Sequence, residues 1–370
     1  MIDLKATLKP GDLFVSYWLA DRLMIAFGDH QEIQEMEIMS AGGLVPLVRA
    51  FAQQVTRIEY FGNFINPEIR PAHWPAPVAP DPPPQKLLEE LRALLIPARL
   101  SETCRKGAFR RLVVFPDGLL HSVPIHLLLG NDQPEGVFAD GVVYAPSASA
   151  YAYCCQKRQT DAPKQAIVVV GDKNDIQLLW EAERISEDIP CATEIVTSLA
   201  DFQKLAPASD IIYVATHGNS PESSATAGAT PSSSEDTEWQ LLLDQDRIVP
   251  RDFFREQIKL KRGSVVILSA CSVGNLMPGE AHELLGLVRS LFYAGAATVL
   301  AARWPILGAT AVTVFANTIK SVFEKNNTFA SGMNRAIIDA SGRDDFRKLM
   351  AGPEASTFFW GGFAVFGCGD

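Results

Sequence analysis

The stretch Val265-Val266-Ile267-Leu268-Ser269-Ala270-Cys271 decides the fold, together with a second stretch of the same design, Ile211-Ile212-Tyr213-Val214-Ala215-Thr216-His217. Each is a short apolar run, rich in β-branched residues, that ends at a reactive side chain. Such runs are typical of strands in a parallel sheet that is buried on both faces. Because the reactive groups of open α/β sheets lie just beyond the carboxyl ends of the strands, we expect His217 and Cys271 to share one cleft there.

The rest of the chain predicts the elements around these two strands. In the second half we expect further strands at residues 166–170, 195–196 and 298–301, and helices at residues 178–189, 284–294 and 309–324. This alternation is typical of a wound, mostly parallel sheet flanked by helices. In the first half, the hydrophobic patterns predict strands at residues 13–19, 22–27 and 112–115, and helices at residues 43–61 and 87–95.

Segments of unusual composition suggest how the chain is divided. Residues 71–84 are crowded with prolines, which predicts an extended surface linker rather than a helix or a central strand. Residues 220–238 are rich in Ser, Thr, Ala and Gly, and we expect them to be mobile, either as a cover for the site or as a tolerated surface insertion. A polar segment near residue 160 is the expected boundary between residues 1–160 and residues 161–370.

Composition and charge exclude several classes of function. A net charge of −10 argues against a nucleic-acid-binding surface, which needs a basic patch. The chain has no run of 18 apolar residues that could cross a membrane, and its first residues lack the apolar core of a signal peptide. Six cysteines without a CxxC pair predict neither a disulfide scaffold nor a zinc site, so we expect no metal or cofactor and a reducing cytoplasm.

His217 and Cys271 together supply the parts of a nucleophilic catalyst. A cysteine attacks as the thiolate, and a neighbouring imidazole can take its proton and later deliver it to the leaving amine. Taken singly, Cys271 would also fit a small buried residue at a strand end, and His217 a turn-capping residue. The two positions lie 54 residues apart, with the histidine first. A histidine about 50 residues before a catalytic cysteine is the order found in caspases.

An ordered set of motifs resembles the CHAT-domain family, bacterial caspase-like cysteine peptidases related to separase. In chain order, the motifs are Val113-Val114-Phe115-Pro116-Asp117-Gly118, Tyr144-Ala145-Pro146-Ser147, Val170-Gly171-Asp172, Ala215-Thr216-His217-Gly218, Leu268-Ser269-Ala270-Cys271, Ala294-Gly295-Ala296, Arg303-Trp304-Pro305 and Phe359-Trp360-Gly361-Gly362-Phe363. The resemblance implies an α/β caspase-like fold whose first half, residues 1–160, is a degenerate, non-catalytic counterpart of the catalytic half. It also implies that the backbone N–H groups of Gly218 and Cys271 form the oxyanion hole.

Two residues compete for the choice of substrate. In Arg-specific relatives of the family, an acidic group near the position of Asp172 contacts the basic side chain before the scissile bond. Arg303 would favour an acidic side chain instead, as in caspases, and family members often carry a small or apolar residue there. A third possibility is that Asp172 and Arg303 pair with each other or cap turns, and the sequence leaves these alternatives open.

The function expected from the resemblance is that of a regulated cysteine endopeptidase in a bacterial defence or cell-death system. Its partner would be a protein substrate cleaved at few sites, such as a gasdermin-like effector, and activity would require an activating partner or signal. The alternative from another class is a catalytically inactive caspase-like scaffold. A nucleotide-binding protein ranks last, because the chain contains neither a G-x-x-x-x-G-K-[ST] loop nor a G-x-G-x-x-G turn after a strand.

Overall fold

The computed structural model describes most of the chain. The described residues are 4–35, 39–56, 81–106, 109–129, 138–159, 161–216, 218–219, 240–244, 246–270, 284–304, 306, 308–343 and 361–370. Several sequence predictions fall outside these residues: His217, Cys271, the segment 220–238 and most of the proline-rich stretch.

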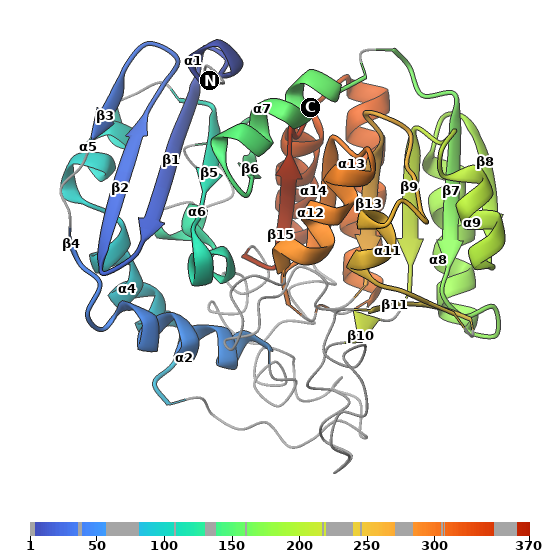
Figure 1. Ribbon diagram of the computed structural model, residues 1–370, viewed down its shortest axis with the longest axis horizontal. Helices are drawn as coiled ribbons and strands as arrows, with labels where there is room; N and C mark the ends of the chain where they lie inside the picture. Colours follow the sequence, from blue (N-terminus) through green and yellow to red (C-terminus); the bar gives the residue numbers. More distant parts are fainter. Residues whose placement is uncertain are drawn as a thin grey trace.

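One mixed sheet passes through both halves of the chain (Figure 1). Within the described residues it has 12 strands, in the order β3-β2-β1-β5-β6-β15-β14-β13-β9-β7-β8, with β4 paired to β2. The strands are β1 Asp12–Leu19, β2 Arg22–Gly28, β3 Ile33–Glu35, β4 Met39–Ser40, β5 Arg111–Phe115, β6 Val142–Tyr144, β7 Gln165–Val170, β8 Ala192–Val196, β9 Ile211–Ala215, β13 Val265–Ser269, β14 Thr298–Ala302 and β15 Phe363–Gly367.

Helices flank this sheet, and a small second sheet lies beside it (Figure 1). The helices are α1 Leu4–Thr7, α2 Leu44–Thr56, α4 Pro84–Leu95, α5 Ala98–Lys106, α6 Ile125–Leu128, α7 Ala148–Lys157, α8 Ile176–Asp188, α9 Leu199–Leu205, α11 Pro250–Phe254, α12 Leu284–Ala294, α13 Gly308–Lys325 and α14 Phe329–Gly342, with a 3₁₀ turn, η2, at Gly118–Ser122. The small sheet has the order β10-β11-β12, with β10 Gly218–Asn219, β11 Gln240–Leu243 and β12 Asp246–Ile248.

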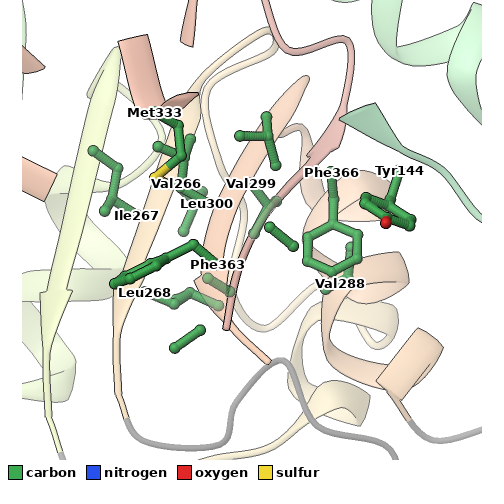
Figure 2. Close-up of a cluster of buried hydrophobic side chains, with 14 of the residues drawn as sticks. Tyr144, Val266, Ile267, Leu268, Val288, Val299, Leu300, Met333, Phe363 and Phe366 are labelled. Atoms are coloured by element: carbon green, nitrogen blue, oxygen red, sulfur yellow. The ribbon is translucent and has the colours of Figure 1, made fainter. Parts of the chain in front are cut away.

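The parallel part of the sheet confirms the predicted α/β fold. Strands β8, β7, β9, β13 and β14 are parallel neighbours, and each contains one of the apolar runs predicted as a strand. Within β13, Val266, Ile267 and Leu268 are all buried, so this strand is covered on both faces (Figure 2). The strand is hydrophobic throughout because side chains that point to opposite faces both meet packed helices.

The last strand joins the two halves of the chain. β15 pairs antiparallel with β14 on one side and pairs with β6 on the other, so it lies in the middle of the sheet. Its Phe363 and Phe366 pack into the buried cluster of Figure 2, which also contains Tyr144 of β6 and Met333 of α14. One sheet therefore continues across the expected boundary, and the division into residues 1–160 and 161–370 stays a prediction.

The linker prediction needs one correction. The sequence predicts that Pro84 belongs to the extended proline-rich stretch, but it is the first residue of α4. Proline is tolerated at this position because the first N–H groups of a helix have no partner within the helix, and because the fixed φ of proline suits a helix start. From there Leu87, Leu88 and Leu91 bury the predicted apolar stripe.

Candidate functional site

The two strands that lead to His217 and Cys271 are direct neighbours. β9 and β13 are parallel, and the last register pair joins Ala215 to Ser269. One residue further, the N–H of Thr216 donates to the carbonyl of Ser269 at 3.3 Å. The two strands therefore end side by side at the same end of the sheet, as the sequence predicted. His217 and Cys271 are the next residues after Thr216 and Ala270, and the dyad itself stays a prediction.

Strand β7 completes this end of the sheet through a close backbone contact. The N–H of Gly171 donates to the Ala215 carbonyl at 2.8 Å, directly after the β7–β9 ladder. A Cβ atom at Gly171 would lie 2.0 Å from Thr216 Oγ1 and 2.7 Å from the Leu242 carbonyl oxygen. Glycine is therefore required here by the close approach of its neighbours.

The small sheet is fastened to the ends of β7 and β9. The hydroxyl of Thr216, which is buried, donates to the Leu242 carbonyl, and the N–H of Asp244 donates to the Gly171 carbonyl. In β10, Gly218 pairs with Leu241 in antiparallel register. The residues on either side of position 217 are thus both bonded to β11. The predicted role of the Gly218 and Cys271 N–H groups in an oxyanion hole is untested.

Asp172 lies in the turn that follows β7. It is partly buried, and its Oδ1 accepts the N–H of Asn174 at 2.8 Å, which stabilises the turn before α8. Next to it, Lys173 forms an exposed ion pair with Asp244 of the small sheet at 3.0 Å. The carboxylate of Asp172 therefore caps a turn at the same sheet end as Thr216, and its contact with a substrate stays a prediction.

Arg303 follows β14 and is buried, with 1% of its surface exposed. Its Nη1 donates to the His121 carbonyl at 2.7 Å, and its guanidinium carbon lies 4.0 Å from the centre of the Tyr144 ring. Among the described residues its Nε and Nη2 have no hydrogen-bond partner. Burial lowers the pKa of this guanidinium. Its substrate role also stays a prediction.

Asp172 and Arg303 cannot form an ion pair with each other. Strands β9 and β13 separate β7 from β14. At about 4.8 Å between neighbouring strands, the two strand ends lie about 14 Å apart.

The motif Tyr144-Ala145-Pro146-Ser147 contributes to a buried polar cluster that the sequence did not predict. Tyr144 Oη lies 2.6 Å from His126 Nδ1 beneath the Arg303 guanidinium. The nearby His121 is buried, and burial lowers its pKa to about 3, helped by the positive charges of Arg303 and Arg289. His121 is therefore a neutral packing residue. No periodic pattern marks this cluster, because its members come from four separate segments of the chain.

The described part of the chain contains neither a metal-binding cluster nor a membrane-spanning helix. No group of three or more His, Cys, Asp or Glu residues there is arranged to hold a metal ion. None of the helices described combines the length and the apolar character that a membrane crossing requires.

Comparisons with known proteins identify the family. A family model described as the CHAT domain matches residues 85–368. Saccharomyces cerevisiae separase, from its complex with securin, superimposes with a TM-score of 0.56 at 8% identity, covering 99% of this chain and 30% of that chain. The Arg-specific cysteine proteinase gingipain R has a TM-score of 0.48 at 10% identity, covering 88% of this chain and 74% of that chain. A comparison with curated proteins found no match.

These findings agree with the fold built from the strands above. The chain spans about 30% of the length of the separase that it resembles, and that likeness shows the fold alone. The family model covers most of the chain, including β7, β9, β13, β14 and β15. The chain therefore belongs to the CHAT-domain family and has the caspase-like fold of cysteine peptidases.

Proposed function

We propose that this chain is a cysteine endopeptidase in which His217 is the general base and Cys271 is the nucleophile. One observation carries the proposal. The N–H of Thr216 donates to Ser269, so the two strands that precede the dyad end side by side. When parallel neighbours end at the same level, the residues that follow them lie close together. Open α/β sheets carry their catalytic groups at this position, beyond the carboxyl ends of the strands.

The reaction follows from the residue types. His217 takes the thiol proton, and the Cys271 thiolate attacks the carbonyl carbon of the scissile peptide. The N–H groups of Gly218 and Cys271 donate to the developing oxyanion. His217 then protonates the leaving amine, and water hydrolyses the thioester. The bonds that hold Thr216 and Gly218 to β11 support this assignment, because they fasten the chain on both sides of the base.

For the substrate we propose a basic residue, arginine above all, before the scissile bond, bound by Asp172. Asp172 is partly exposed in the turn after β7, the strand next to β9, whereas Arg303 is buried against the rings of Tyr144 and Phe366. A carboxylate holds a guanidinium with two parallel hydrogen bonds, which an amide cannot match in strength. In a positional-scanning peptide library, a preference for Asp or Glu would reject this assignment in favour of Arg303. Asp172→Asn should lower kcat/KM for arginine substrates selectively.

The proposed setting is regulated proteolysis in a bacterial defence or cell-death system. The substrate is a protein cleaved at few sites, such as a gasdermin-like effector, and an activating partner is part of the proposal. The family to which the chain belongs supports this setting, and its substrate and partner are the parts that experiment has to identify.

The decisive experiment maps new protein N-termini in cells that express the wild type, Cys271→Ala or His217→Ala. We expect a small set of N-termini that appears only with the wild type, with one residue type recurring before the cut. Equal sets of N-termini in all three strains, with an activating partner present, would favour a catalytically inactive scaffold. Iodoacetamide labelling provides a control that needs no substrate, because His217→Ala should slow alkylation of Cys271 alone.

A further inference from the structure

A cavity of about 460 Å³ lies at the opposite end of the sheet from the candidate site. Its walls include Ile211, Val265 and Thr298, the first residues of β9, β13 and β14. Residues 158–159 and 161–163, between α7 and β7, line another side. The cavity therefore lies where the segment from the first half of the chain meets the strands of the second half. Small-molecule sites are often found between parts of a protein and have volumes of about 300–1,000 Å³.

One wall of this cavity is apolar. Val322 and Phe323 belong to the last turns of α13, and Phe329 is the first residue of α14. Both α13 side chains are partly exposed, and the rings of Phe323 and Phe329 meet in a T-shaped contact with their centres 6.1 Å apart. Burying apolar surface against rings of this kind is favourable, because it removes that surface from water. The wall therefore suits a large aliphatic or aromatic group.

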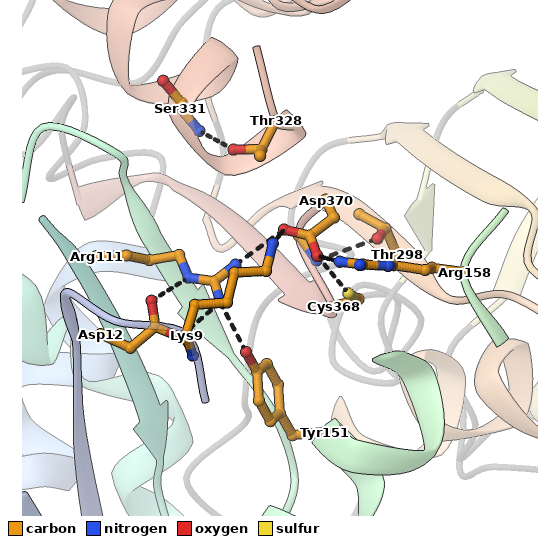
Figure 3. Close-up of polar contacts among 11 residues, drawn as sticks. Lys9, Asp12, Arg111, Tyr151, Arg158, Thr298, Thr328, Ser331, Cys368 and Asp370 are labelled. Atoms are coloured by element: carbon orange, nitrogen blue, oxygen red, sulfur yellow. Dashed lines mark hydrogen bonds and ion pairs between the residues drawn. The ribbon is translucent and has the colours of Figure 1, made fainter. Parts of the chain in front are cut away.

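The residue after α7, Arg158, brings a positive charge to the cavity (Figure 3). It pairs with Asp370, which also accepts from Lys9 at 2.7 Å and from Arg111 at 3.0 Å. Arg111 in turn binds Asp12 through two bonds of 2.9 and 2.7 Å. Among the described residues, this cluster therefore holds three cations and two carboxylates. The Arg158 side chain is 39% exposed, and its pair with Asp370 uses only some of the N–H groups of the guanidinium, so it can also donate to an anionic ligand group.

Asp161 brings an exposed carboxylate to the same cavity. Among the described residues it forms no hydrogen bond or ion pair. Asp210 also lines the cavity, but it pairs with Lys261 and accepts the N–H groups of Lys164 and Gln165 at 2.9 and 3.2 Å. Asp161 is therefore the carboxylate that would meet a cationic group of a ligand.

Two side-chain amides also line the cavity. Asn326 is exposed in the turn between α13 and α14, where it adopts the left-handed φ of 55°. The neighbouring Asn327 donates through Nδ2 to Ser321 Oγ at 2.9 Å, which leaves its Oδ1 atom as an acceptor. Because an amide has both donors and an acceptor, it can bond to a carboxylate or to an ammonium group. The polar part of the lining thus accommodates both charges.

We propose that this cavity binds a free α-amino acid with a large apolar side chain. The carboxylate of the amino acid pairs with Arg158, its ammonium group pairs with Asp161, and its side chain packs against Phe323 and Phe329. Arg158 and Asp161 are three residues apart, a distance of at most about 11 Å along the chain, so one small ligand can contact both. An anion would leave Asp161 without a partner, and a cation would leave the surplus charge at Arg158 unmatched. A ligand that carries both charges is therefore the best match.

This site is separate from the proposed peptidase chemistry. Ile211 and Val265 begin the two strands whose other ends precede His217 and Cys271. The amino acid and the peptidase substrate would therefore lie at opposite ends of the same two strands. Binding of the amino acid can be measured without any peptidase activity.

The test is isothermal titration calorimetry of the full chain with L-phenylalanine and L-leucine as probes. We expect one amino acid to bind per chain. The analogue 3-phenylpropionate lacks the ammonium group and phenethylamine lacks the carboxylate, so each should bind at least about tenfold more weakly than phenylalanine. The Cys271→Ala variant should give the same affinities, so the result does not depend on the proposed nucleophile. No binding of phenylalanine or leucine, or binding of either analogue as tight as that of phenylalanine, would overturn the proposal.

The exposed carboxylate of Asp161 supplies the matched variant. Asp161→Asn should weaken phenylalanine binding about tenfold and leave 3-phenylpropionate binding unchanged, because that analogue has no ammonium group. The control is Glu194→Gln, which removes an exposed carboxylate from β8, away from the cavity lining, and should change neither affinity. Equal losses for both ligands in Asp161→Asn, or an unchanged affinity for phenylalanine, would reject the pairing with Asp161 and with it the proposed ligand.

Discussion

Two buried arginines lie at opposite ends of the same sheet and meet very different partners. Arg111, at the start of β5, is bonded to two carboxylates, Asp12 and Asp370 (Figure 3). Arg303, after β14, meets no carboxylate among the described residues. Its charge faces the His121 carbonyl and the rings of Tyr144 and Phe366. The same side chain is therefore an ion-pair partner at one end and a buried cation held by dipoles and aromatic faces at the other.

The two arginines show two different ways in which the first and second halves of this protein are joined. At the Arg111 end the cost of removing charge from water is offset by opposite charges and several hydrogen bonds. At the Arg303 end, one strong hydrogen bond and the cation–π contacts are all that the described residues supply to offset that cost. The stability of the Arg111 junction should therefore depend strongly on its charges. The Arg303 junction should tolerate, or even be stabilised by, removal of its single positive charge.

The largest effect is expected from Arg111→Met. This change keeps most of the side-chain volume but leaves Asp12 and Asp370 without their shared partner. Breaking a buried ion pair by removing one member costs about 3–5 kcal/mol. The free energy of unfolding in urea should fall by that amount. The neighbouring exposed pair is the control, because water screens the contact of Arg110 with Asp140, so Arg110→Met should lose far less stability than Arg111→Met. Equal losses in the two variants would contradict the comparison.

The next largest effect concerns the sheet end that carries the candidate site. In Gly171→Ala the new methyl group would meet the Thr216 hydroxyl and the Leu242 carbonyl oxygen far inside contact distance. Overpacking of this kind costs about 1–3 kcal/mol. Because Thr216 precedes His217, alkylation of Cys271 should slow as well. The control is Gly286→Ala in α12, where the nearest atom is 3.6 Å away and helix propensity should raise stability by about 0.5–1 kcal/mol. If Gly171→Ala left both the stability and the rate of Cys271 alkylation unchanged, the close approach of Gly171 to Thr216 would not hold this end of the sheet in place.

The sequence predicted the strands of the second half well because their signal is local. Residues 211–215, 265–268 and 298–301 are runs that are apolar apart from Thr298, and each lies within a strand of the structure. The side-by-side ends of β9 and β13 followed from the general rule for parallel sheets. Pairing of β15 with β14 and β6 did not follow, because strand order depends on contacts between segments far apart in the chain.

The two arginines show the same limit for the candidate site. The sequence offers Arg303 as the competitor of Asp172 for contact with a substrate and leaves open that it pairs with Asp172 or caps a turn. Its burial depends on Tyr144 and Phe366, which come from two other strands. The charged cluster around Arg111 was missed for a similar reason, although charged residues at the starts of two apolar strands, Asp12 and Arg111, were a visible signal. Local patterns predict elements, whereas the partners of a buried charge are a property of the assembled sheet.

A third prediction uses pH to probe the Arg303 junction. Folding keeps His121 neutral, with a pKa of about 3, because it is buried beside Arg303. The unfolded chain protonates this residue near its ordinary pKa of about 6.5, so stability falls as pH falls through that value. From pH 7.5 to 5.5 the loss should be about 1.4 kcal/mol. His121→Gln should remove this part of the slope, while its stability difference from the wild type stays constant above pH 7.5. An unchanged slope would show that His121 charges in the folded protein.

The smallest effect, and the sharpest contrast, is expected from Arg303→Met. The change removes a buried charge that has two unpartnered nitrogens among the described residues and keeps an apolar chain against Tyr144 and Phe366. The lost bond to the His121 carbonyl is worth about 1.5–3 kcal/mol because its donor is charged. Relief from burying that charge offsets most of this loss, so urea unfolding should shift by less than about 1 kcal/mol. Arg303→Lys should be the worse variant, because a compact ammonium is more strongly hydrated than a guanidinium and lacks its flat face for stacking on a ring. At Arg111 the order should reverse, since lysine retains the charge that the two carboxylates need. If methionine proved worse than lysine at both positions, an anion outside the described residues would have to meet Arg303, and the two ends of the sheet would be alike.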